Sequence, residues 1–234
     1  MLIDVTRLVQ RSLKGMLPTG VDRVSAAYVQ HYADRAAALV RVAGHWAVLG
    51  PGASRRLFDA LLDRGPGSLR RLALSACSGI AGPAGRRSHR VLLHTGHSGL
   101  DQPGFAREVS RRQLLPVYFA HDLIPISHPE FCRAGEAKRH QLRIRTMFDT
   151  GKALIVNSQA TRGALADYGS EHGLRLPECV VAPLAPAPLP RPSEQAPLAH
   201  DYFVILGTIE PRKNHALLLQ VWRRLLAQFG DAAP

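Results

Sequence analysis

Short apolar runs alternate with longer stretches of helical spacing along most of this chain, and this alternation limits the folds open to it. The runs that predict strands are residues 2–5, 39–42, 91–94, 115–120, 153–156, 180–182 and 202–206. The stretches that predict helices are residues 21–31, 55–74 with a break at 65–67, 134–149, 159–168 and 214–229. Apolar strands separated by helices form parallel sheets that are covered on both faces. We therefore expect an α/β protein.

A proline-rich segment divides the chain. Six prolines lie between residues 183 and 197, a composition typical of a semi-rigid linker. A new strand and a new helix are predicted after it. We expect a first α/β domain over residues 1–184, a linker over 185–200 and the start of a second α/β domain over 201–234. One strand and one helix cannot form a domain, so the second domain is expected to be truncated.

The loops between these elements carry several polar residues. Residues 6–20 predict a glycine-containing loop between the first strand and the first helix, and residues 75–90 predict another loop. Ser158 suits the N-cap of the helix over 159–168, because its hydroxyl can accept a hydrogen bond from the first turn. His94 and His97 flank a glycine turn after a strand, where they could line a cleft. Histidines of the core or the surface are the alternative.

The segment from Gly207 to His215 has the sharpest chemical pattern. Its sequence is Gly-Thr-Ile-Glu-Pro-Arg-Lys-Asn-His, which places Arg212 and Lys213 directly before a helix that is predicted to begin near Asn214. A helix N-terminus offers unpaired N–H groups and a positive dipole end, and the two cations would strengthen its attraction for a diphosphate. An ordinary basic loop with Asn214 as a helix cap is the alternative.

The same segment resembles the start of the second domain in retaining glycosyltransferases of the GT-B type, the group 1 or family 4 class. The resemblance implies two Rossmann-like domains, the second incomplete here, and a donor diphosphate held by the basic residues. On this basis the donor-binding residues are Gly207, Thr208, Arg212, Lys213 and Asn214. The sequence departs from many family members in having Thr208 where they have an arginine after the glycine.

Two parts of the N-terminal half also resemble this family. The segment Pro-Thr-Gly-Val-Asp-Arg-Val at residues 18–24 is similar to the loop after the first strand, and Gly20 there would let the backbone approach donor and acceptor closely. The segment 118–125 resembles a strand that ends in His-Asp. The resemblance implies that His121 positions the acceptor hydroxyl and that Asp122 orients His121. As isolated residues, a His-Asp pair is also compatible with a structural role.

The resemblance implies transfer of a hexose or deoxyhexose from a nucleotide-diphosphate sugar, such as GDP-mannose, to an acceptor hydroxyl with retention. The acceptor would be a saccharide or a lipid-linked saccharide in bacterial polysaccharide or lipopolysaccharide synthesis, and no metal or cofactor would be required. The truncated chain would then have little activity alone. One alternative is a non-catalytic module that binds an acceptor or a partner, and another is a related GT-B enzyme such as an epimerase or a phosphorylase.

The net charge of +12 does not point to nucleic acid. Most of the 30 basic residues are Arg, and they are not interleaved with aromatic residues as in a nucleic-acid-binding surface. The Leu- and Arg-rich stretch at 55–74 would allow peripheral contact with an anionic membrane, although a solvated helix face is the alternative. With no apolar run of 18 residues and no signal-like N-terminus, we expect a cytoplasmic protein. The cysteines at 77, 132 and 179 have neither disulfide nor zinc spacing.

Overall fold

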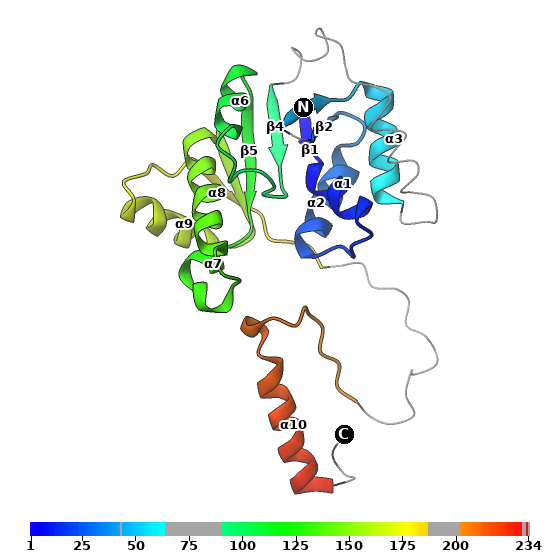
Figure 1. Ribbon diagram of the computed structural model, residues 1–234, viewed down its shortest axis with the longest axis vertical. Helices are drawn as coiled ribbons and strands as arrows, with labels where there is room; N and C mark the ends of the chain where they lie inside the picture. The colour runs from blue at the N-terminus through cyan, green and yellow to red at the C-terminus, as the bar shows by residue number, and fades with distance from the viewer. Residues whose placement is uncertain (43, 64–89, 187–201, 231–232, 234) are drawn as a thin grey trace. The chain divides into compact units, whose positions relative to one another are not determined.

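The computed structural model describes residues 1–42, 44–63, 90–186, 202–230 and 233 (Figure 1). Two compact units divide the chain. The first consists of residues 1–123 and 138–184 and contains the sheet, and we call it the sheet unit. The second consists of residues 124–137 and 185–234, and we call it the helical unit. Each unit is described by itself.

A seven-stranded sheet with the order β3-β2-β1-β4-β5-β6-β7 forms the centre of the sheet unit. All neighbouring strands are parallel except β2 and β3, which form an antiparallel pair at one edge. This is the strand order of a Rossmann-like, doubly wound sheet. The strands are β1 (Leu2–Asp4), β2 (Ala37–Val42), β3 (His45–Val48), β4 (Val91–His94), β5 (Leu115–Ala120), β6 (Ala153–Val156) and β7 (Glu178–Val181).

Helices cover both faces of this sheet, as Figure 1 shows for α2 (Gly20–Tyr32) and α3 (Pro51–Leu62) on one side and α8 (Glu136–Thr150) and α9 (Gln159–Glu171) on the other. Consecutive residues of β1, Leu2 and Ile3, are therefore both buried. Ile3 belongs to the core beneath α2 and α3. Burial of both faces explains why the strands are apolar throughout rather than alternating.

Four differences separate the N-terminal half of the structure from the sequence-based prediction. The expected loop at 6–20 contains a helix, α1 (Thr6–Leu13). The antiparallel strand β3 was not predicted, and neither was α6 (Phe105–Arg111). The helix expected from residue 55 begins at Pro51, which suits the first helical position because proline has no N–H to leave unpaired there. The expected helix beyond residue 63, the loop at 75–89 and Cys77 lie outside the described residues.

The other helices agree closely with the prediction. Helices α8 and α9 lie where helices were expected, and the hydroxyl of Ser158 accepts a hydrogen bond from the N–H of Thr161 (3.1 Å). The prediction that Ser158 is an N-cap is thereby confirmed.

The helical unit contains α7 (Ile124–Ser127), two 3-10 turns, η1 (Pro129–Phe131) and η2 (Pro211–Lys213), and the long helix α10 (His215–Phe229). The predicted helix at 214–229 is confirmed. The predicted strand at 202–206 is wrong, because these residues form no strand and are exposed. A strand needs a neighbour for its N–H and C=O groups, and within the described part of the chain no strand pairs with this segment. Most of the expected linker, residues 187–200, lies outside the described residues.

Candidate functional site

The direction of the strand order reverses between β1 and β4. From β1 the chain continues to β2 on one side, whereas β4 lies on the other side and is followed by β5 and β6. Ligands of doubly wound sheets bind at such a reversal, outside the carboxyl ends of the strands. Here that edge carries Asp4, the last residue of β1, and Thr6 just beyond it, together with His94, the last residue of β4, and the following residues to Ser98.

A buried ion pair between Asp4 and Arg41 joins the carboxyl ends of β1 and β2. One carboxylate oxygen of Asp4 accepts a hydrogen bond from the N–H of Thr6 (2.9 Å), and the other accepts one from Nε of Arg41 (2.8 Å). His94 Nε2 lies 3.5 Å from the second oxygen. Burial raises the pKa of Asp4, but the charges of Arg41 and His94 and the hydrogen bonds from Thr6 outweigh it, so the pKa lies below its ordinary value.

The guanidinium of Arg41 also reaches the loop that follows β4. It donates hydrogen bonds to the carbonyl oxygen and to the hydroxyl of Ser98, the latter at 2.8 Å. Gly99 has a φ of +73°, and a Cβ on it would lie 2.0 Å from a guanidinium nitrogen of Arg41. Glycine is therefore required at position 99, both for its backbone conformation and for the close approach of Arg41.

A second ion-pair group joins α1 to the start of α2. The Asp22 carboxylate lies 2.8 Å from Nε of Arg7 and 2.8 Å from Nε of Arg11, and it also accepts hydrogen bonds from the N–H and the hydroxyl of Thr19, each 2.7 Å long. Thr19 and Asp22 thus form a capping box around Gly20, the predicted site residue. No atom lies within 4 Å of where a Cβ of Gly20 would be, and its φ is not in the left-handed region.

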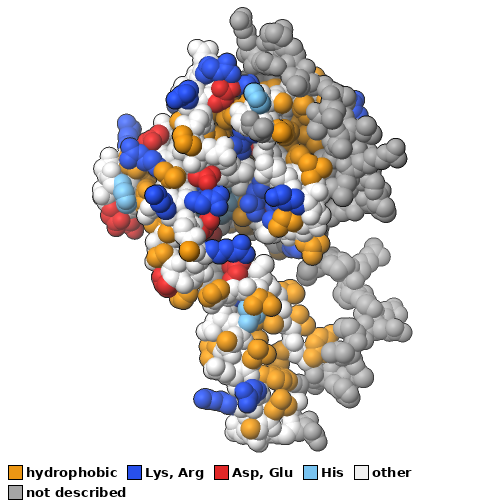
Figure 2. Space-filling model, viewed as in Figure 1, with side chains coloured by type: hydrophobic (Ala, Val, Ile, Leu, Met, Phe, Trp, Pro, Cys, Tyr) orange, Lys and Arg blue, Asp and Glu red, His pale blue; other side chains and the backbone are white. Residues whose placement is uncertain are grey.

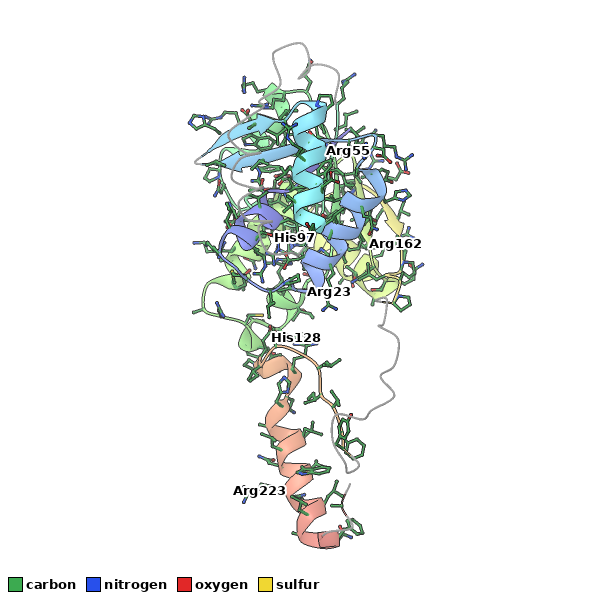
Figure 3. All side chains as sticks on the ribbon, turned by 90° about the vertical axis from the view of Figure 1, so that its right-hand side faces the viewer. Arg23, Arg55, His97, His128, Arg162 and Arg223 are labelled. Atoms are coloured by element: carbon green, nitrogen blue, oxygen red, sulfur yellow. The ribbon has the colours of Figure 1, made fainter. Side chains whose placement is uncertain are left out.

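Three histidines meet at the carboxyl ends of β4 and β5. The ring centroid of His97 lies 5.1 Å from that of His121 and 5.9 Å from that of His140. The Nε2 groups of His121 and His140 donate to the carbonyl oxygens of Thr95 (2.9 Å) and Asp122 (2.9 Å). Figure 3 labels His97 within the sheet unit.

The protonation state of this histidine cluster follows from its burial. Burial, together with repulsion from His121 and His140, places the pKa of His97 well below its ordinary value. Burial also lowers the pKa of His121. A carbonyl oxygen only accepts hydrogen bonds, so the proton of neutral His121 is on Nε2 and its Nδ1 is an acceptor. A neutral imidazole with this tautomer can accept a proton from a hydroxyl group.

In the helical unit, the segment from Gly207 to His215 forms a turn before α10. The hydroxyl of Thr208 donates to Glu210 (2.6 Å), and Nε2 of His215 donates to the carbonyl oxygen of Thr208 (3.0 Å). Asn214 has a φ of 49°, and its side-chain oxygen accepts a hydrogen bond from the N–H of Leu217 (3.3 Å) as the N-cap of α10. Lys213 is exposed, and the side chain of Arg212 is not among those described.

The structure thus distributes the predicted site residues over separate groups. Gly20 belongs to the Asp22 group, His121 belongs to the histidine cluster together with the backbone of Asp122, and residues 207–214 belong to the helical unit. Sequence reasoning missed Asp4 and Arg41. The signal for them was a charged residue inside each of two apolar strands, since a buried charge requires a partner.

Comparisons with known proteins add no relative, because no family model, no curated protein and no solved structure matches the chain. Within the described ranges, no helix is long and apolar enough to cross a membrane. The same residues contain no group of three or more His, Cys, Asp or Glu side chains arranged to hold a metal ion.

Proposed function

We propose that this chain is part of a retaining glycosyltransferase of the GT-B type that uses a nucleotide-diphosphate sugar, such as GDP-mannose. The observation that carries the proposal is the basic turn Pro211–Lys213, which leads directly into the N-terminus of the 15-residue helix α10. A turn with two cations before a helix N-terminus suits a diphosphate. The Rossmann-like sheet unit supports the proposal as the expected first domain.

The proposed chemistry divides between the two units. Arg212, Lys213 and the N–H groups at the start of α10 would neutralise the charge that develops on the diphosphate as the sugar leaves. Gly207, Thr208 and Asn214 would shape the backbone around these cations, and we call residues 207–214 the donor segment. The acceptor, a saccharide or a lipid-linked saccharide of polysaccharide synthesis, would bind at the carboxyl edge of the sheet, where neutral His121 would accept a hydrogen bond from the attacking hydroxyl.

A non-catalytic module that binds an acceptor or a partner is the second candidate. It is favoured by the exposed segment 202–206, which pairs with no strand in the described part of the chain. In such a module Arg212 and Lys213 of the donor segment would bind no ligand, so replacing them would not change the result of a titration with a sugar nucleotide.

Calorimetric titration of the chain with GDP-mannose, and separately with UDP-glucose, distinguishes the two candidates. The variant Arg212→Ala/Lys213→Ala should bind the donor at least about tenfold more weakly, because charge-assisted hydrogen bonds to the diphosphate are lost. Arg223→Ala/Arg224→Ala removes the same charge from α10, away from its N-terminus, and should bind as the wild type does. Absence of donor binding by the wild type, or equal binding by all three proteins, would contradict the proposal.

A further inference from the structure

A strongly basic cavity of about 590 Å³ lies at the reversal point of the sheet, next to the histidine cluster but lined by other residues. Its wall comes from α1 and the residues after it, from β2 and β3, from the loop after β4, and from α6 and α8. Six cationic side chains line it: Arg7, Arg11, Lys14, Arg41, Arg139 and Arg143. Lys and Arg side chains also gather on the face of the sheet unit that is visible in Figure 2.

The described residues that line the cavity include only two carboxylates, Asp101 and Glu108, against these six cations. Among these six cations, Asp22 pairs with Arg7 and Arg11, and Asp4 pairs with Arg41. Asp101 is shared between Arg139 (3.0 Å) and Arg143 (3.9 Å). For Lys14 the described residues offer no ion-pair partner.

The remaining carboxylate of the wall is Glu108, and it is engaged elsewhere. Its hydrogen bonds with Arg111 and Arg112, neither of which lines the cavity, lower its pKa to about 2. The cavity therefore keeps an excess of positive charge at neutral pH.

The cations are also held in place before any ligand arrives. Arg41 is fixed by Asp4 and Ser98, and its guanidinium lies 5.6 Å from the ring centroid of Trp46 and 5.2 Å from that of Phe105. Arg7 is fixed by Asp22. Ordered guanidinium groups lose little conformational entropy when they bind an anion, and their forked geometry matches phosphate oxygens.

We propose that this cavity binds a diphosphate group. The six cations come from several elements and outnumber the three carboxylates that pair with them, Asp4, Asp22 and Asp101, and the volume is that of a small-molecule site. The inference rests on the proposed function in one respect: the diphosphate would belong to the acceptor, since the donor diphosphate is assigned to residues 207–214. Two sources share this chemistry, a water-soluble diphosphate ester and a polyprenyl diphosphate in a membrane.

The test measures binding in a protein that already carries Arg212→Ala/Lys213→Ala, so that the proposed donor segment contributes no cations. Calorimetry with inorganic pyrophosphate tests the soluble source. Co-sedimentation with phosphatidylcholine vesicles that contain a polyprenyl diphosphate tests the membrane source, and vesicles with phosphatidylglycerol instead report general surface charge. We expect pyrophosphate to bind, and stronger sedimentation with polyprenyl diphosphate than with phosphatidylglycerol would identify the lipid as the source.

Charge reversal at the mouth of the cavity locates the site. Lys14→Glu/Arg139→Glu should weaken pyrophosphate binding by about tenfold or more. The matched control Lys152→Glu/Arg162→Glu changes two exposed cations outside the cavity (Arg162 is labelled in Figure 3) and should leave binding within about twofold. Thermal unfolding of both variants checks that they are folded. No pyrophosphate binding in the starting protein, or equal weakening by the two charge reversals, would overturn the proposal, whether or not the donor segment binds a sugar nucleotide.

Discussion

Single residues at the carboxyl edge of the sheet have roles that depend on their neighbours across the chain. Arg41 contacts Asp4, which is 37 residues earlier, and Ser98, which is 57 residues later. Gly99 permits this arrangement because it has no Cβ. The shape of the basic cavity therefore depends on a glycine whose missing side chain leaves room for Arg41.

We predict that Gly99→Ala destabilises the sheet unit by about 1–3 kcal/mol, because alanine is strained at a positive φ and its Cβ would displace Arg41. Urea unfolding followed by circular dichroism measures this change. Gly104→Ala is the matched control, since its φ is −83° and no atom lies within 4 Å of its Cβ position. If the two variants were equally stable, the close approach of Arg41 to Gly99 would make no contribution to the stability of the sheet unit.

At the scale of elements, α1 is the clearest difference between sequence and structure. Residues 6–13 were predicted as loop because their apolar residues, Leu8, Val9 and Leu13, are few among arginines and other polar side chains. Tertiary contacts hold this segment in a helix instead. Arg7 and Arg11 lie one turn apart and both pair with Asp22, while Val9 is buried in the core.

The ion pairs of Asp22 predict a pH dependence of stability. Burial raises the pKa of this carboxyl, but the hydrogen bonds from Thr19 and the charge of Arg7 outweigh it, so the pKa is lowered in the folded chain. The folded state then binds fewer protons than the unfolded state, whose Asp pKa is about 3.9. This contribution to stability is complete above about pH 5 and is lost as the pH falls through the folded pKa.

Asp22→Asn should accordingly cost about 1–3 kcal/mol in unfolding free energy at pH 7, with a difference from wild type that narrows toward pH 3. Urea unfolding at a series of pH values gives this difference directly. Asp149→Asn removes an exposed carboxylate that pairs with Arg145 within one helix, and should cost less than about 0.5 kcal/mol. If the difference in unfolding free energy between Asp22→Asn and the wild type stayed constant with pH, the charge of Asp22 would be excluded as the cause of the stabilisation.

For the whole molecule, the hydrophobic core belongs to the sheet unit. Within the described part of the chain, the buried hydrophobic side chains all lie in residues 1–123 and 138–168. Helix α10 has none, and four of its leucines, Leu217, Leu218, Leu219 and Leu226, are exposed. Burial of apolar surface is the main source of folding stability, so the sheet unit should not depend on α10.

We predict that removal of residues 201–234 shifts the midpoint of thermal unfolding of the sheet unit by less than about 3 °C, which corresponds to about 1 kcal/mol for a chain of this size. Differential scanning calorimetry of the shortened and the complete chain measures the shift. A decrease of 10 °C or more would mean that α10 contributes to the stability of the sheet unit.

The apolar strands of the second half of the sheet and the helices with regular apolar spacing were the most predictable parts of the chain. The strands of the sheet unit from residue 91 onward and helices α8, α9 and α10 were found close to their expected positions. The segment 202–206 had the same apolar character, yet it forms no strand, because pairing depends on neighbours that local sequence cannot supply. The candidate site was less predictable. His97 and His121 were each named from the sequence, but their contact with one another and with His140 joins residues that are distant in sequence.

The sequence by itself determined the α/β class, because apolar periodicity and caps such as Ser158 act within a few residues of the chain. It also determined the basic turn before α10, which needs only Pro211, Lys213, Asn214 and their neighbours. The tertiary structure alone decided which charges meet. Asp4 meets Arg41 because parallel strands bring their carboxyl ends to one edge, whatever the distance between them in the sequence, and Arg7 meets Asp22 because α1 packs against α2. The basic cavity forms where α1, the loop after β4 and α8 come together at this edge.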